Sequence, residues 1–133
     1  MCERAPVRQG TIKIFIVDID GTICEHVSNE AGAQKMLDAA PFPESIASVN
    51  RWYDEGHIIC FFTARTDEHA SATEAWLKKH GVKYHKVIYN KPRKIAPYTE
   101  YHFIDDTPVR ATRFTGKMGA FVRKAKEIEV FEE

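Results

Sequence analysis

The stretch FIVDIDGTIC, residues 15–24, ends an apolar run on two aspartates that a single residue separates. The carboxylates of Asp18 and Asp20 would repel each other at this spacing, and no cationic residue lies beside them in the sequence. A divalent cation that both carboxylates share would offset the repulsion. The pair therefore predicts a metal-assisted reaction or a metal site.

Further polar residues stand where later apolar runs stop. Thr63 comes near the end of HIICFFTAR, Lys91 follows YHKVIYN, and Asp105 and Asp106 close YHFIDD. Hard carboxylate ligands favour Mg²⁺, and a lysine would offset the charge of a phosphate group. A hydroxyl such as that of Thr63 could bind a phosphoryl oxygen. The combination predicts phosphoryl transfer to an aspartate.

The elements that must position these residues alternate between strands and helices. Buried apolar runs predict strands at residues 11–20, 57–65, 84–90, 101–106 and 119–124. Helical spacing of apolar residues predicts helices at residues 43–56 and 66–81. This alternation predicts an α/β fold with a doubly wound, mainly parallel sheet of about five strands. Ligands of such sheets bind at the carboxyl ends of the strands, where the polar residues are expected.

Length and composition fit one domain that spans residues 1–133. Residues 1–10 are expected to form a flexible arm, and residues 23–42 a flap or loop. With 19 basic and 19 acidic residues, the zero net charge gives no electrostatic reason to expect nucleic acid or an anionic membrane as partner. Three cysteines without a C-x-x-C pair argue against a disulfide framework. With neither a signal peptide nor a membrane helix expected, the predicted location is the cytoplasm.

Four motifs resemble, in order, those of the haloacid dehalogenase-like (HAD) phosphatases. They are DIDGT at 18–22, FFTAR at 61–65, the lysine of NKP at 90–92 and IDD at 104–106. The resemblance implies a Rossmann-like phosphatase domain that hydrolyses a phosphate monoester with Mg²⁺. Many members of this superfamily carry an inserted cap domain, but residues 23–42 are too few for one. We therefore expect an open site, which a large substrate or a neighbouring subunit of a homo-oligomer would cover.

The same resemblance implies a role for each matching residue. Asp18 would be the nucleophile that forms an aspartyl-phosphate, and Asp20 would protonate the leaving oxygen and then deprotonate the attacking water. Thr63 and Lys91 would hold the phosphoryl group. Further contacts to phosphate or substrate are expected from Thr22, Ala64 and Arg65. The expected Mg²⁺ ligands are Asp18, Asp20 through its backbone carbonyl, Asp105 and Asp106, the last directly or through water.

Several assignments stay open at this stage. Lys94 competes with Lys91 as the motif lysine, because element boundaries read from sequence err by a few residues. Arg65 could bind substrate or form a salt bridge at the start of the following helix. His26 lies in the segment that could fold over the site.

The substrate is the least determined feature. The spacing of TAR, WLKKHGVKY and KP resembles small phosphatases encoded with bacterial capsule and surface-polysaccharide pathways, which implies a sugar phosphate. The alternatives are a nucleotide phosphatase, a polynucleotide 3'-phosphatase and a domain that binds without turnover. A non-enzymatic phospho-accepting receiver module is a further alternative, although its acidic pair comes first in the chain rather than last.

Overall fold

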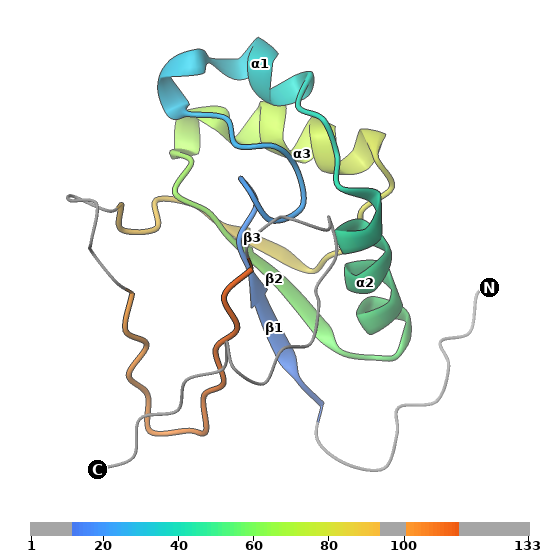
Figure 1. Cartoon of the computed structure of the whole chain (residues 1–133), viewed down its shortest axis with the longest axis vertical. Helices are drawn as coiled ribbons and strands as arrows, with labels where there is room; N and C mark the ends of the chain where they lie inside the picture. The colour runs from blue at the N-terminus through green and yellow to red at the C-terminus, as the bar shows by residue number, and fades with distance from the viewer. Residues whose placement is uncertain (1–11, 94–100, 115–133) are drawn as a thin grey trace.

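A computed structural model describes residues 12–93 and 101–114 of the chain. In this part, three parallel strands form one sheet in the order β1-β2-β3 (Figure 1). The strands are β1 (Ile14–Val17), β2 (Ile58–Phe62) and β3 (Lys86–Ile88). β2 is central, and its carboxyl end lies between those of its two neighbours. The three strands predicted at residues 11–20, 57–65 and 84–90 are confirmed, each shorter than its predicted range.

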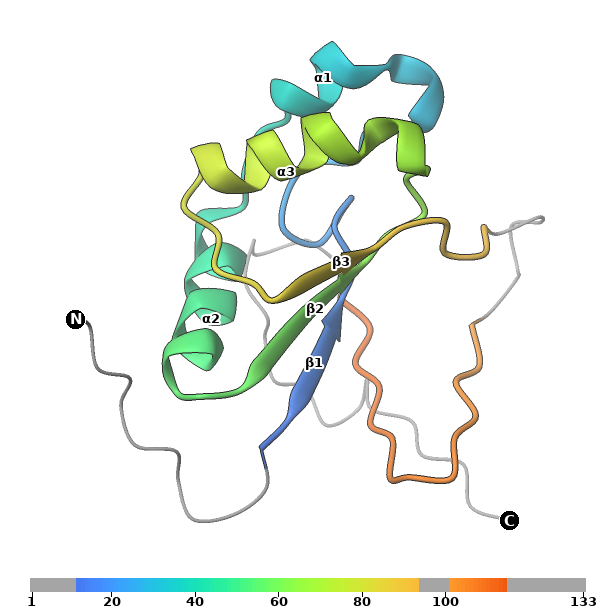
Figure 2. The same cartoon turned by 180° about the vertical axis from the view of Figure 1, so that it is seen from behind.

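Helices connect the strands on one side of the sheet. The α-helices are α1 (Ala33–Leu37), α2 (Pro43–Asp54) and α3 (Ala70–Lys79), and single 3-10 turns form η1 (Asn29–Ala31) and η2 (Asp67–His69). α2 and α3 cover the same face of the sheet, and α1 lies against α3 (Figures 1 and 2). The connections from β1 to β2 and from β2 to β3 each lead to the next strand in the sheet, in the same direction. When both connections are right-handed, their helices lie on the same face of the sheet.

The predicted helix at 43–56 is confirmed as α2. Pro43 occupies the first turn of α2, where a backbone N–H would have no partner within the helix. Gly56, just after the helix, has a φ of 97°, a conformation that glycine adopts without strain. Ile46 and Val49 are buried on its inner face. Trp52 stacks on Phe15 of β1 with ring centroids 4.0 Å apart and planes within 1°. These contacts fix α2 against the sheet.

The predicted helix at 66–81 corresponds to η2 followed by α3. Its Trp76 is 1% exposed and is among the largest buried side chains. The Trp76 indole Nε1 donates a hydrogen bond of 2.9 Å to the carbonyl of Ala39, which satisfies the one polar atom of the ring. This bond ties the segment before α2 to α3. Residues 23–42 were expected to form a flap or loop. They include η1 and the short helix α1, which packs on α3.

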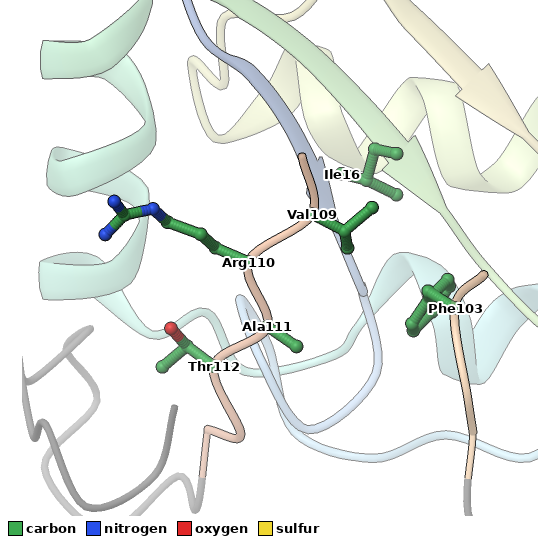
Figure 3. Close-up of a pocket in the computed structure, with 6 residues that line it drawn as sticks. All are labelled: Ile16, Phe103, Val109, Arg110, Ala111 and Thr112. Carbon is green, nitrogen blue, oxygen red and sulfur yellow. The ribbon is translucent and has the colours of Figure 1, made fainter. Parts of the chain in front are cut away.

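The opposite face of the sheet has large apolar side chains exposed. Ile14 and Ile16 of β1 are 66% and 61% exposed. Ile16 also lines a pocket with Phe103, Val109, Ala111, Arg110 and Thr112. Figure 3 shows Ile16, Val109 and Phe103 around this pocket, with the guanidinium of Arg110 extending away from Ile16. No aspartate of the predicted site lines the pocket, so it is not the predicted phosphate site.

The count of about five strands is not confirmed. Residues 101–106, predicted as a strand, are exposed and have no strand pairing in the structure. Their hydrophobic side chains, Tyr101, Phe103 and Ile104, are all exposed, so this short run is a weak strand signal without a partner edge. The strand predicted at 119–124 lies outside the described residues. With helices on one face only, the described part is a singly covered parallel sheet, and the second helical layer of a doubly wound fold is not seen in it.

Two further features concern the helices and the cysteines of the described residues. None of the helices in the described residues is long and apolar enough to cross a membrane. Cys24 and Cys60 are both buried free thiols.

Candidate active site

Asp18 directly follows β1, and its partner comes from the end of β3. The Asp18 carboxylate Oδ1 lies 3.1 Å from the ammonium Nζ of Lys91. The Asp18 side chain is 41% exposed, whereas that of Lys91 is 13% exposed. Thr22 Oγ1 lies 3.4 Å from Asp18 Oδ2, a long hydrogen bond. Asp18 is therefore an accessible carboxylate with one enclosed cation beside it.

The backbone after β3 turns Lys91 toward this carboxylate. Asn90 has a φ of 65°, a left-handed conformation that asparagine tolerates better than most residues. Its N–H donates to the carbonyl of Arg65, and the N–H of Lys91 donates to the carbonyl of Thr63, each at 2.9 Å. The loop after β3 is thereby fastened to the loop after β2. This geometry favours Lys91 as the motif lysine; Lys94 lies outside the described residues.

Two aromatic rings flank the Lys91 ammonium. Nζ lies 5.7 Å from the ring centre of Phe62 and 5.4 Å from that of Tyr101, both within cation–π range. The Tyr101 hydroxyl donates to the carbonyl of Pro92. Sequence reasoning did not select Tyr101, because it stood at the amino end of a predicted strand, whereas the site residues were sought at carboxyl ends.

Asp20 is paired with a different cation. Its carboxylate accepts hydrogen bonds from Arg65 Nη2 at 2.8 Å and Arg65 Nε at 3.0 Å, one on each oxygen. The backbone N–H of Val27 donates a third bond to Asp20 Oδ1 at 3.2 Å. Arg65 is 2% exposed and Asp20 is 13% exposed. Asp20 is thus an enclosed carboxylate in a two-pronged ion pair, in contrast to the open Asp18.

The ion pair bears on the two alternatives for Arg65. The structure places Arg65 in a salt bridge, one of the two alternatives, but its partner is Asp20 and not a residue at the helix start. The Arg65 side chain is buried, and its Nε, Nη1 and Nη2 all donate within the protein. Burial, followed by the charge of Asp20, raises the pKa of the neighbouring Cys24 thiol to about 12.

A tight turn follows the two aspartates. Gly21 has a φ of 81°, which a residue with a Cβ adopts at a cost, although nothing lies within 4 Å of where that Cβ would stand. Conformation, and not space, therefore favours glycine here. The N–H groups of Thr22 and Ile23 both donate to the carbonyl of Ile19 at 3.0 Å, and the Ile19 side chain is fully buried. Ile19, which stands between Asp18 and Asp20 in the sequence, thus anchors the turn in the core.

The remaining motif residues lie at the end of β2. Thr63 is fully buried, and its Oγ1 accepts the backbone N–H of Arg65 at 3.1 Å. The carbonyl of Ala64 accepts a bond of 3.2 Å from the side-chain amide of Asn29 in η1. The predicted site residues from β1, β2 and β3 are therefore brought together at one edge of the sheet.

Asp105 and Asp106 are not brought into this cluster. Asp105 is exposed and accepts hydrogen bonds from the backbone N–H and the hydroxyl of Thr107, at 3.1 and 3.2 Å. The N–H bond is the largest cause of a lowered pKa at Asp105. Residues 12–93 and 101–114 contain no group of three or more His, Cys, Asp or Glu residues that could hold a metal ion. The side chains present there do not assemble the predicted Mg²⁺ ligand set.

Three other residues that sequence reasoning missed support the site. The backbone N–H of Val27 bonds to Asp20, and the side chain of Asn29 bonds to the carbonyl of Ala64. A sequence motif reveals neither a backbone donor nor a contact between residues far apart in the chain. Thr73 did leave a signal. Its hydroxyl lies on the buried face of α3 beside Ala72 and Trp76, and a buried hydroxyl requires a partner. That partner is Arg65 Nη1, at 3.0 Å.

Comparison with known proteins adds two similarities. A family model described as "PITM 1-3, LNS2 domain" matches residues 15–102, more than half of the chain. The match includes DIDGT, FFTAR and Lys91, and it ends before Asp105 and Asp106. No curated protein matches the chain.

A solved structure, the crystal structure of an MCSG target from Vibrio cholerae, superposes with a TM-score of 0.55. The two chains are 23% identical, and the alignment covers 87% of this chain and 93% of the other. At this level of identity, the likeness concerns the fold alone.

Proposed function

We propose that this chain, which belongs to the family of the PITM 1-3 LNS2 domain and hence to the HAD-like superfamily, hydrolyses phosphate monoesters through an aspartyl-phosphate on Asp18. The family is phosphatase-related, which supports the reaction class in general. The substrate, the intermediate and the roles of individual residues are our own proposal.

One observation carries the proposal: two nearby aspartates have opposite environments. Asp18 is 41% exposed and lies beside one ammonium, whereas Asp20 is 13% exposed and held by a guanidinium. Two carboxylates in contrasting surroundings can take different roles in one reaction. The accessible one suits nucleophilic attack, and the enclosed one suits proton transfer.

The proposed reaction has two steps. Asp20 first takes up a proton from solvent. A carboxylate oxygen of Asp18 then attacks phosphorus, the ester P–O bond breaks, and the leaving oxygen takes that proton from the Asp20 carboxyl. Water then attacks the aspartyl-phosphate, its proton goes to Asp20, and the bond between phosphorus and Asp18 breaks. The products are the alcohol and phosphate, and both aspartates regain the states that they had before the first attack. Lys91 offsets phosphoryl charge in both steps.

We propose Mg²⁺ as the cofactor, because HAD-like phosphatases generally use it. The described side chains alone do not gather its ligands. Asp105 and Asp106 remain the proposed source of the missing carboxylates.

For the substrate, we propose a sugar phosphate or a similar small phosphorylated metabolite, as in the small capsule and polysaccharide phosphatases that the motif spacing resembles. The exposed side of Asp18 leaves room for a bulky substrate or for cover by a second copy of the chain. The proposed location is the cytoplasm, since a reducing compartment suits the free thiols Cys24 and Cys60.

Phosphate release is the direct test. The purified chain is incubated with sugar phosphates, nucleotides and 3'-phosphorylated oligonucleotides, each with Mg²⁺ and with EDTA. We expect release that requires Mg²⁺ and is fastest with a sugar phosphate. Asp18→Asn, which keeps the shape of the side chain but is a poor nucleophile, should release none.

Each outcome bears on a separate part of the proposal. Fastest release from an oligonucleotide would overturn the substrate class and keep the reaction. Release that EDTA does not affect would overturn the cofactor. No release from any substrate by the folded chain would overturn the function and favour a domain that binds phosphate without turnover.

A further inference from the structure

We propose that Arg65 is a positioning residue for Asp20, and that Thr73 holds Arg65 in the required orientation. The inference rests on the proposed function, because it assigns Asp20 the proton transfer in that reaction. Arg65 would contact Asp20, and Thr73 would in turn contact Arg65. The motif resemblance implies a substrate contact for Arg65 and gives no role to Thr73.

The guanidinium of Arg65 holds Asp20 by two bonds. Nε and Nη2 of Arg65 donate to the two oxygens of Asp20, at 3.0 and 2.8 Å. Two parallel bonds between planar groups fix both the place of the carboxylate and its rotation, which a single bond to a lysine would not do. The plane in which Asp20 presents its oxygens is therefore set by Arg65.

Arg65 is itself anchored by other elements. Its remaining terminal nitrogen, Nη1, donates to Thr73 Oγ1 at 3.0 Å, and Thr73 is 1% exposed within α3. Its backbone N–H donates to Thr63 Oγ1, and its carbonyl accepts the N–H of Asn90. Both the side chain and the backbone of Arg65 are thus fixed by other elements, so the guanidinium has little freedom to follow a displaced Asp20.

Arg65 and Asp20 differ in their exposure to solvent. Arg65 is 2% exposed, and its Nε, Nη1 and Nη2 are all hydrogen-bonded within the protein, so the side chain is nearly closed to solvent. Asp20 keeps 13% exposure and is the member of the pair that a substrate can reach. Arg65 therefore acts through Asp20.

The test uses the fact that acid assistance matters in proportion to the basicity of the leaving oxygen. An alkyl phosphate, such as a sugar 6-phosphate, needs a proton on its leaving oxygen, whereas p-nitrophenyl phosphate needs little. For each variant, kcat/KM is measured with both substrates, because this ratio reports the first chemical step. A residue that merely stabilises the fold would lower both values by the same factor.

Thr73 offers the cleanest pair of variants. Thr73→Val keeps the volume and removes the hydroxyl, and Thr73→Ser keeps the hydroxyl. We expect Thr73→Val to lower kcat/KM about tenfold for the alkyl substrate and less than about twofold for the aryl substrate. Thr73→Ser should restore the alkyl value to within about threefold of that of the unchanged chain.

Arg65→Lys tests the pair directly. It keeps the positive charge and removes the two-pronged contact, so the alkyl rate should fall by about a hundredfold, with a much smaller change for the aryl substrate. Arg51→Lys, the same change at an exposed position of α2, is the control. Should Arg65→Lys fail to fold, the Thr73 pair decides alone.

The outcomes separate this inference from the proposed function. Equal losses on the two substrates, or no loss in Thr73→Val, would overturn the positioning role while leaving the phosphatase in place. If the unchanged chain turns over neither substrate, the proposed function fails and the positioning role fails with it.

Discussion

Lys91 Nζ lies 3.1 Å from Asp18 Oδ1, although the two residues are 73 positions apart in the sequence. Together with the pair of Arg65 and Asp20, this contact gives each aspartate of the D-x-D motif its own cation. The repulsion expected between the carboxylates is offset by two separate side chains.

Lys91→Met is predicted to lower kcat/KM about a hundredfold, the scale of losing one preorganised charge in an active site. The variant leaves Asp18 without its cation, so a phosphate dianion approaches an uncompensated carboxylate. Steady-state phosphate release measures the change.

Two controls accompany that prediction. Lys83→Met removes a comparable but exposed ion pair, to Asp54 at 2.8 Å, and should leave turnover unchanged. Lys94→Met should also leave it within about threefold. A larger loss in Lys94→Met than in Lys91→Met would mean that the wrong lysine has been assigned.

Asp20→Asn is predicted to cut turnover by at least about a hundredfold and to leave phosphate binding largely intact. The same change removes the charged partner of a guanidinium that is 2% exposed, so the free energy of unfolding should fall by about 3 kcal/mol. Urea unfolding and phosphate titration measure the two effects. Near-normal turnover would remove Asp20 from the mechanism, and unchanged stability would mean that the ion pair contributes little.

Asp105→Asn is predicted to raise the Mg²⁺ concentration for half-maximal activity about tenfold, because it removes a proposed carboxylate ligand. Hydrogen bonding by Thr107 lowers the pKa of Asp105, so its ionised form should persist at lower pH than that of an ordinary aspartate. Asp38→Asn, at the exposed end of α1, is the matched control. Superimposable Mg²⁺ curves for the unchanged chain and Asp105→Asn would exclude Asp105 as a ligand.

Cys24 is predicted to resist alkylation in the folded protein. Burial raises its pKa to about 12, so even at pH 9 only about one thiol in a thousand is the reactive thiolate. Cys60 is also buried, and its pKa is raised for the same reason. In a Cys2→Ser background, iodoacetamide should label neither thiol at pH 8 until urea is added. Rapid labelling of folded Cys24, which lies 3.9 Å from Arg65 Nη2, would mean that the ion pair is open to solvent.

The parts of the fold that local pattern encodes could be predicted from the sequence. β1 and β2 are short apolar runs, and α2 has Ile46 and Val49 at helical spacing. The five residues of α1 escaped prediction, because a helix this short is held by packing on α3 and not by its own periodicity. Residues 101–106 were predicted as a strand from a short run of hydrophobic residues, which does not specify a partner strand.

The candidate site divides in the same way. Polar residues at strand ends identified Asp18, Thr63 and Lys91, because a parallel sheet brings such ends to one edge. The pairing of Arg65 with Asp20 could not be predicted, since the local pattern was compatible with either a substrate contact by Arg65 or a salt bridge at the helix start. Which cation meets which carboxylate is decided by side-chain directions that only the assembled fold defines.

The order of the strands also bears on how the chain folds. Cys60 pairs with Lys86, whereas Ile14 pairs with Ile58, so β2 and β3 close a shorter loop than β1 and β2. The entropy of loop closure favours the shorter one by about half a kcal/mol. We therefore expect the unit of β2, α3 and β3 to form first during folding. The loops that carry Thr63, Arg65 and Lys91 would then meet before β1 delivers its two carboxylates, so the cations of the site are assembled ahead of the anions that they bind.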